Sequence, residues 1–169
     1  MISRAAQENL ARVFDGPTLT LLGTVDADGR PWTRYVMGVL DDRGTIRVAT
    51  KRDSRKVADV ERLPFVHLLV GRDLFSSDCE YVQIGGKAVV VDGAQPVAAW
   101  NPTARTFLSG SNPSYALIEI RPYRVEVWSA KAAPNENPLV FEEDDPDADF
   151  EASLSRFWVD DEEFEPEPV

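Results

Sequence analysis

Thr50-Lys51-Arg52-Asp53-Ser54-Arg55-Lys56 is the most informative stretch of this chain. It follows a β-rich segment and opens a helical one, which Asp53 or Ser54 can cap. A helix N-terminus presents unsatisfied N–H donors and a positive dipole end, and serine, threonine and arginine side chains can complete the coordination of a phosphate. The stretch therefore predicts an anion site, although a basic helix start without further context is more often a solvated surface.

Upstream of this stretch, the sequence predicts a helix and three consecutive antiparallel strands. An amphipathic helix over residues 2–14 ends at Asp15-Gly16-Pro17. The β-rich segments are residues 18–25, 32–40 and 45–50, joined by the turn sequences Asp26-Ala27-Asp28-Gly29 and Asp41-Asp42-Arg43-Gly44.

Downstream, a short helix through Leu63 is closed by Pro64, and three more strands are predicted. These cover residues 65–70, 80–92 and 115–129, with a helix expected at 96–108 between the last two. Consecutive strands with few β–α–β alternations favour a closed antiparallel barrel over a doubly wound parallel sheet. The predicted fold class is therefore mainly β, a β-barrel with flanking helices.

Charge is distributed unevenly along the chain. The net charge is −11, but residues 136–169 hold fourteen acidic groups against Arg156 alone, so the remaining body is close to neutral. We predict one domain over residues 1–133 and an acidic C-terminal tail over 134–169. The tail can be interpreted as a disordered solubilising segment. A short docked helix is predicted within it, because four large apolar residues fall on one helical face: Phe150, Leu154, Phe157 and Trp158.

Several classes of function are disfavoured by composition. A nearly neutral body argues against a nucleic-acid partner, which needs a basic excess. The N-terminus has no apolar run that could serve as a signal peptide or membrane span, so we expect a cytoplasmic protein with no membrane partner. Cys79 and His67 are the only cysteine and histidine, which argues against a metal site, and we expect His67 to be a core residue.

Four segments together resemble a known family. They are Arg34-Tyr35-Val36, matching R-x-V; Thr50, Ser54, Arg55 and Lys56, matching T-x-x-x-S-R-K; Tyr81-Val82-Gln83-Ile84-Gly85-Gly86, similar to V-R-I-x-G; and Pro122-Tyr123-Arg124-Val125-Glu126-Val127-Trp128, similar to P-x-x-V-E-x-W. Over roughly residues 1–130 the chain resembles the split β-barrels that bind flavin mononucleotide (FMN), the pyridoxamine 5′-phosphate oxidase-like proteins. Each segment is weak alone, but their order and spacing are specific.

The resemblance implies a cofactor, a set of binding residues and an assembly. Arg34, Ser54, Arg55 and Lys56 would hold the FMN phosphate, and Thr50 would lie near the ribityl chain. Backbone groups around Tyr35, Val36 and Ala49 would line the isoalloxazine, and Trp128 would reach the flavin of the other subunit. The family binds its cofactor across a twofold interface, so a homodimer with FMN at that interface is implied.

The departures from the family pattern bear on activity. Val39 stands where the true oxidases have a substrate-contacting lysine, Tyr81 replaces a flavin-contacting glutamine, and Ala49 replaces an aromatic residue. The segment after Trp128 also lacks the oxidases' substrate motif. The general stress protein branch is therefore the better match.

The leading functional hypothesis is an FMN-dependent oxidoreductase that uses a small-molecule electron donor or acceptor, with unknown substrate and no assignable catalytic acid or base. One alternative is a flavin-binding stress protein without turnover. Another, suggested by Ala49 and Tyr81, is a split barrel that uses a deazaflavin or no cofactor.

Overall fold

The computed structural model describes residues 2–72, 77, 79–92 and 114–142. Along this part of the chain the elements follow in the order α1 (Arg4–Val13), β1 (Thr18–Val25), β2 (Pro31–Leu40), β3 (Ile46–Lys51), α2 (Arg55–Arg62), β4 (Phe65–Arg72), β5 (Glu80–Asp92), β6 (Tyr115–Ser129), the 3-10 helix η1 (Pro134–Glu136) and β7 (Leu139–Glu142).

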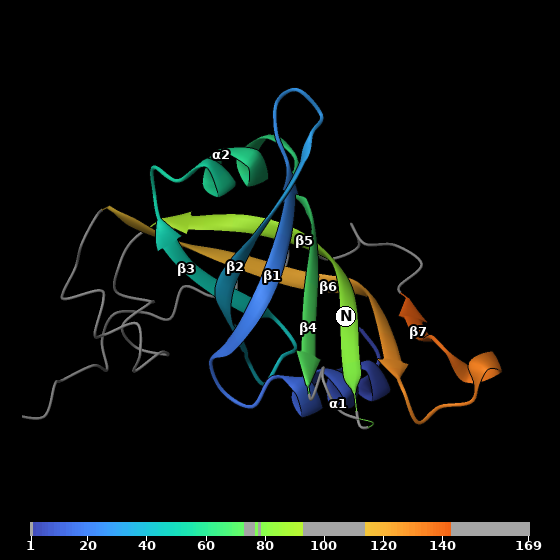
Figure 1. Cartoon of the computed structure of the whole chain (residues 1–169). Helices are drawn as coiled ribbons and strands as arrows, with labels where there is room; N and C mark the ends of the chain where they lie inside the picture. Colours follow the sequence, from blue (N-terminus) through green and yellow to red (C-terminus); the bar gives the residue numbers. More distant parts are fainter. Residues whose placement is uncertain (1, 73–76, 78, 93–113, 143–169) are drawn as a thin grey trace, which may run out of the picture.

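The strands form one antiparallel sheet that closes on itself (Figure 1). Their order is β3-β2-β1-β4-β5-β6-β7, and β3 also pairs with β6, so β1 to β6 make a barrel and β7 is appended at its side. Closure pairs β3 with β6 and so leaves less exposed strand edge than an open sheet of this size would carry. The predicted mainly β barrel with flanking helices is confirmed.

The barrel is split where β2 and β3 part. β2 pairs with β1 along eight residue pairs but with β3 along only three, which join Gly38–Leu40 to Ile46–Val48. Beyond these pairs, residues 31–37 of β2 pair only with β1, and residues 49–51 of β3 pair only with β6, within the part of the chain that the structure describes. The two strand edges that face this split carry backbone groups without a ladder partner, and such groups need another partner.

The two turn sequences form tight hairpins by the same chemistry. In the first, the Asp26 carboxylate accepts hydrogen bonds from the backbone N–H groups of Asp28 and Arg30, both at 2.9 Å. Gly29 then takes φ +78°, a conformation that other residues rarely adopt. Asp41 and Gly44 repeat this arrangement in the second turn. These local interactions explain why both hairpins could be predicted from sequence.

The helices cover opposite ends of the barrel (Figure 1). α1 begins at Ser3, whose hydroxyl accepts a hydrogen bond from the Ala6 N–H at 3.2 Å, and it buries Ala6, Leu10 and Val13. α2 buries Val57 and Val60 at the other end. Full burial of a leucine or valine side chain stabilises a fold by about 1.5–3 kcal/mol, so both helices are held mainly by their apolar faces.

The strand β7 was not predicted from the sequence. Its residues pair with β6 in the register Val125↔Phe141 and Val127↔Leu139, and Phe141 packs against the core. Four residues are too few to show a clear alternation of apolar and polar side chains, and the acidic residues that follow obscure this pattern. The helices predicted at 96–108 and at Phe150–Trp158 lie outside the described residues.

A basic cradle at the split of the barrel

The turn from β3 into α2 leaves polar groups available at the start of the helix. The N-cap, Ser54, has extended backbone angles of φ −75° and ψ 146°, and its side chain makes no capping hydrogen bond. The first N–H groups of any α-helix have no intrahelical acceptor. The Ser54 hydroxyl and the backbone N–H groups of Arg55 and Lys56 are therefore polar groups at the N-terminus of α2.

Arg34 extends from β2 toward α2. Its guanidinium donates to the Thr24 hydroxyl at 2.6 Å and lies 3.6 Å from the Asp59 carboxylate. Thr24 in turn donates to Asp59 at 2.6 Å, and both of these residues are nearly fully buried. Burial lowers the pKa of Arg34, the charge of Asp59 opposes that change, and the charge of Arg55 adds to it. Asp59 thus holds Arg34 in place and ties α2 to β2.

Lys56 lies on the same helix and faces the same region. Its ammonium group donates to the Thr50 hydroxyl at 2.7 Å, and the Thr50 and Ser54 hydroxyls are 3.3 Å apart. Burial lowers the pKa of Lys56, and the positive charge of Arg34 lowers it further. We call the set of Arg34, Thr50, Ser54, Arg55 and Lys56 the basic cradle.

Arg55 is held from the side by an aromatic ring. Its guanidinium carbon lies 3.8 Å from the centroid of the Trp32 ring, a cation–π contact. The Trp32 indole N–H donates to the Asp26 carboxylate at 2.8 Å. Neither Trp32 nor Asp59 was selected from the sequence. Asp59 did leave a signal, because it is a charged residue between Val57 and Val60 on the apolar face of α2.

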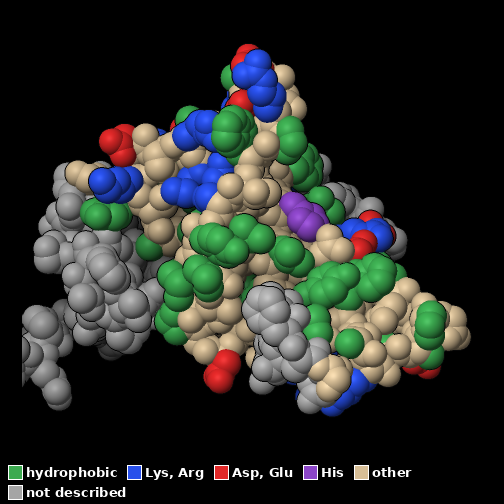
Figure 2. All heavy atoms as spheres, viewed as in Figure 1, with side chains coloured by type: hydrophobic (Ala, Val, Ile, Leu, Met, Phe, Trp, Pro, Cys, Tyr) green, Lys and Arg blue, Asp and Glu red, His purple; other side chains and the backbone are tan. Residues whose placement is uncertain are grey.

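The charges of the cradle are unbalanced. Arg34, Arg55 and Lys56 are three neighbouring cations, and Asp59 is the buried carboxylate that pairs with Arg34. Arg52 does not add to this excess, because it pairs with Glu61 at 2.6 Å and Asp92 at 2.5 Å. Figure 2 shows Lys and Arg side chains gathered around α2. An anion with several acceptor oxygens, such as a phosphate, matches this excess and the neighbouring donors.

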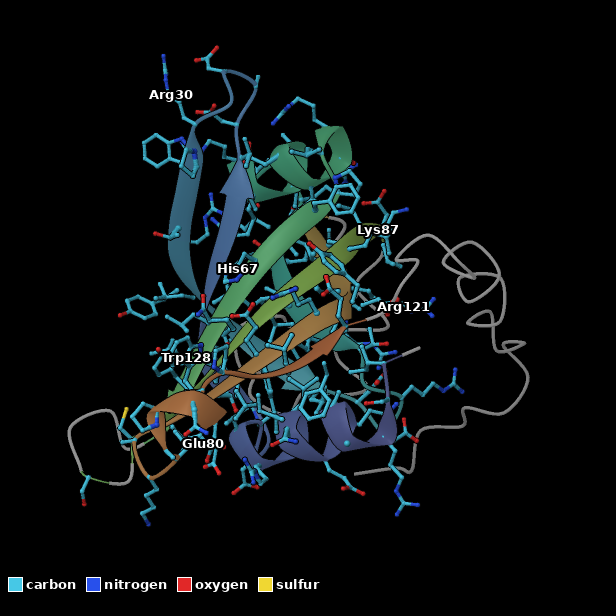
Figure 3. The ribbon with its side chains drawn as sticks, turned by 90° about the vertical axis from the view of Figure 1, so that its right-hand side faces the viewer. Arg30, His67, Glu80, Lys87, Arg121 and Trp128 are labelled. Carbon is cyan, nitrogen blue, oxygen red and sulfur yellow. The ribbon has the colours of Figure 1, made fainter. Side chains whose placement is uncertain are left out.

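The remaining predicted site residues divide into two groups. Tyr35 and Val36 lie on the part of β2 that borders the split, and Ala49 lies on the facing part of β3. Trp128 is not near the cradle within one chain. It stacks on Tyr81 with ring centroids 5.8 Å apart, and its indole N–H is buried without a partner. In Figure 3 it lies toward the α1 end of the barrel, whereas α2 covers the other end.

His67 is not a core residue, so that expectation was wrong. It is exposed on the outer face of β4, where Figure 3 shows it near the middle of the strand. There it lines an open groove of about 490 Å³ together with Leu21, Phe65, Gln83 and Tyr123. The alternation along β4 buries Val66 and Leu68 and turns His67 outward.

Among the described residues, no group of three or more His, Cys, Asp and Glu side chains is arranged to hold a metal ion. No helix in the same residues is both long and apolar enough to cross a membrane.

The fold and the cradle define a class of protein: a split β-barrel with an anion site where the barrel opens. Comparison with known sequences assigns the family. The family model described as pyridoxamine 5′-phosphate oxidase matches residues 6–129, and the chain therefore belongs to this family.

Similar proteins agree with this assignment. General stress protein 26 of Bacillus subtilis (strain 168) is 28% identical over 126 residues, which are 73% of this chain and 89% of that protein. The crystal structure of General Stress Protein 26 from Bacillus anthracis str. Sterne is 28% identical, with a TM-score of 0.60 over 72% of this chain and 92% of its own. The expected resemblance to the general stress protein branch is confirmed.

More distant structures share the fold but differ in what their names say they bind. A pyridoxamine 5′-phosphate oxidase-related, FMN binding protein from Nostoc punctiforme PCC 73102 is 17% identical, with a TM-score of 0.61 over 78% of this chain and 85% of its own. An F420 reductase is also 17% identical, with a TM-score of 0.55 over 68% of this chain and 94% of its own. The fold alone therefore does not select one cofactor.

Proposed function

We propose that this chain is an FMN-binding flavoprotein that acts as an oxidoreductase on a small-molecule electron donor or acceptor. One observation carries the proposal: among the described residues, Arg34, Arg55 and Lys56 gather near the start of α2, where Asp59 pairs with Arg34, beside the open strand edges of the split. A ligand that carries a phosphate and a planar ring system matches both features, with the phosphate at the cations and the ring at the strand edges.

The residues present fit FMN in two respects. Arg34, Arg55, Lys56 and the Ser54 hydroxyl offer charge-assisted and neutral donors to a phosphate, aided by the N-terminus of α2. The backbone edges at Tyr35, Val36 and Ala49 offer donors and acceptors to the polar rim of an isoalloxazine. Bound flavin supplies hydride or electron transfer, while the protein binds and orients it.

We further propose a homodimer with the cofactor at its interface. Five large apolar side chains are exposed on the outer surface of β1, β2 and β4, with exposed fractions from 36% to 69%: Leu19, Tyr35, Met37, Phe65 and Leu69. The strand register makes this surface, which we call the apolar face, continuous, since Leu19 lies beside Met37 and Leu21 lies between Tyr35 and Leu69. Figure 2 shows hydrophobic side chains across it. Contiguous exposed apolar surface marks an interaction site. In such a dimer, the partner's copy of Trp128 is our candidate for the flavin contact.

The test is a comparison of FMN with riboflavin, which lacks the phosphate. We expect FMN to bind more tightly, and Arg55→Ala to weaken FMN by roughly one to two powers of ten while leaving riboflavin unchanged, because a charge-assisted hydrogen bond contributes about 1.5–3 kcal/mol. Arg52→Ala is the matched control, since it removes a nearby arginine that is already paired with Glu61 and Asp92. Equal affinity of the unaltered protein for both flavins would overturn the phosphate site.

The cofactor and the activity need separate measurements. The visible absorption spectrum of protein purified without added cofactor, and the mass of the molecule released on denaturation, distinguish FMN from a deazaflavin, a haem or no cofactor. Turnover with a reduced nicotinamide distinguishes an oxidoreductase from a flavin-binding stress protein without activity. A cytoplasmic location stays a prediction from the sequence.

A further inference from the structure

Trp32 is in an unusual position beside the cradle. It lies on β2 two residues before Arg34, so both side chains project from the same side of the strand. Trp32 is 42% exposed, although tryptophan is generally well buried, and the guanidinium carbon of Arg55 lies 3.8 Å from the centroid of its ring. Trp32 is therefore not a core residue, and its main described partner on the face of the ring is a cradle cation.

The orientation of the Trp32 ring is set from its edge. Its N–H donates to one oxygen of the Asp26 carboxylate at 2.8 Å. The other Asp26 oxygen accepts the backbone N–H groups of Asp28 and Arg30, which close the hairpin turn. These hydrogen bonds hold the pKa of Asp26 below its usual range, so the acceptor is charged at neutral pH. The ring is thus joined to a rigid turn.

The same hairpin is fastened to α2 at two further points. Asp59 pairs with Arg34, and Arg62 donates to the backbone carbonyl oxygens of Val25 and Asp26. Arg55, Asp59 and Arg62 are spaced at i, i+4 and i+7, so these contacts with the hairpin come from one face of α2. Arg55 is the contact nearest the helix N-terminus, where the anion is expected.

The Trp32 ring can keep Arg55 close to Arg34 in the ligand-free cradle, although both residues are positively charged. The charge of Arg55 lowers the pKa of Arg34, as expected for two neighbouring cations. An exposed arginine that is repelled in this way would otherwise extend into solvent. The negative face of an aromatic ring attracts a cation without neutralising its charge. Trp32 can therefore hold Arg55 near Arg34 and leave its N–H donors free for a ligand, unlike a carboxylate partner.

Resting on the function proposed above, we propose that Trp32 is a positioning residue for phosphate recognition. Oriented by Asp26, the Trp32 ring holds the Arg55 guanidinium near the other residues of the basic cradle before the ligand arrives. Trp32 thereby raises the affinity for phosphorylated flavins relative to unphosphorylated ones, although it does not contact the phosphate. Preorganisation of this kind raises affinity because less side-chain freedom is lost on binding.

The experiment compares the riboflavin-to-FMN ratio of dissociation constants among variants of the full chain. We expect Trp32→Leu to lower this ratio by about threefold to thirtyfold, the range that corresponds to an exposed to partly desolvated cation–π contact. Trp32→Phe keeps a ring and retains most of the ratio. Asp26→Asn gives an intermediate value, because the ring loses its charged acceptor. Thermal unfolding midpoints of all variants are measured alongside, since a merely structural role would lower stability and leave the ratio unchanged.

A second background isolates the mechanism. In an Arg55→Ala chain, adding Trp32→Leu is expected to leave the ratio where Arg55→Ala alone put it, because the residue that Trp32 positions is gone. If Arg55→Ala lowers the ratio and Trp32→Leu does not, the positioning role is wrong while the phosphate site stands. If Arg55→Ala itself has no effect, the assignment of Arg55 to the phosphate site fails, and the role of Trp32 fails with it.

Discussion

Asp59 is the residue on which the cradle depends, because it is the buried carboxylate that balances Arg34. Removing one member of a buried ion pair leaves an uncompensated charge. We predict that Arg34→Met lowers the free energy of unfolding toward the lower end of about 3–5 kcal/mol, since Arg34 is 21% exposed and solvent screens part of the effect.

The double variant separates charge from packing. Arg34→Met combined with Asp59→Asn should recover most of the lost stability, because asparagine is neutral and can still accept the Thr24 hydroxyl. Urea unfolding without ligand measures the stability of the unaltered protein and of both variants. If the double variant is as unstable as Arg34→Met, the buried charge is not the cause.

The pKa of Lys56 leads to a prediction about how the stability of the protein depends on pH. Its pKa in the folded protein lies below its ordinary value, so the unfolded chain binds more protons between those two values. The free energy of unfolding must therefore rise with pH across that window. The stability gained when Lys56 is neutral is fully present above its ordinary pKa of about 10.4, and it is lost as the pH falls through the pKa of Lys56 in the folded protein. Lys56→Met should remove this slope.

The measurement is the free energy of unfolding of both proteins from about pH 8 to 10.5, without ligand. FMN affinity should change in the opposite direction, falling as the Lys56 ammonium loses its proton. Equal slopes for the two proteins would show that Lys56 is as well solvated as in the unfolded chain.

At the scale of elements, the pairing of β5 with β6 contains a bulge opposite two glycines of β5, with Tyr123 as the extra residue on β6. The register with β6 shifts between Gly85 and Gly86. A Cβ on Gly86 would lie 2.5 Å from the Ile120 Cγ2 in the buried core, whereas a Cβ on Gly85 would meet the Tyr123 ring at 3.0 Å. Tyr123 is only partly buried, so its side chain can move.

We predict that Gly86→Ala destabilises the protein by about 1–3 kcal/mol, the usual cost of overpacking a core, and that Gly85→Ala costs less. Thermal and urea unfolding of both variants test this order. A larger effect of Gly85→Ala would mean that Tyr123, and not Ile120, is the more rigid neighbour.

The hairpins and long strands were predictable because their signals are local. Asp26 and Gly29 specify a turn on their own, and β5 and β6 begin and end where the sequence placed them. The resemblance also placed Arg34, Ser54, Arg55 and Lys56 in one site. The contacts of that site could not be predicted, because Trp32, Thr24 and Asp59 join it only through the packing of α2 against the hairpin. His67 was placed in the core in error, because the alternation of side chains along a strand separates them into two faces but does not say which face is buried.

At the scale of the whole molecule, the apolar face predicts an assembly. Leu69→Asp places a charge in the middle of that face and should give a monomer with weakened FMN binding, because an unpaired charge is costly to bury in an interface. Leu139→Asp is the control: Leu139 is also an exposed leucine, but it lies on β7, outside the face. Light scattering at micromolar concentration measures the mass of each protein. A monomeric unaltered chain that still binds FMN tightly would contradict the proposed dimer.

The closure of the barrel has a consequence for the order of folding. The hairpins join residues close in sequence, but β3 and β6 meet over long distances, as in the Arg47–Glu119 pair, 72 residues apart. Joining such distant segments carries the larger loop entropy and is the slow event in β proteins. The basic cradle draws on β2, β3 and α2, since Arg34 meets Asp59 and Lys56 meets Thr50. During refolding, the capacity to bind a phosphate should therefore appear after most of the β-structure has formed, so that ligand binding reports the last step by which the barrel becomes a closed ring.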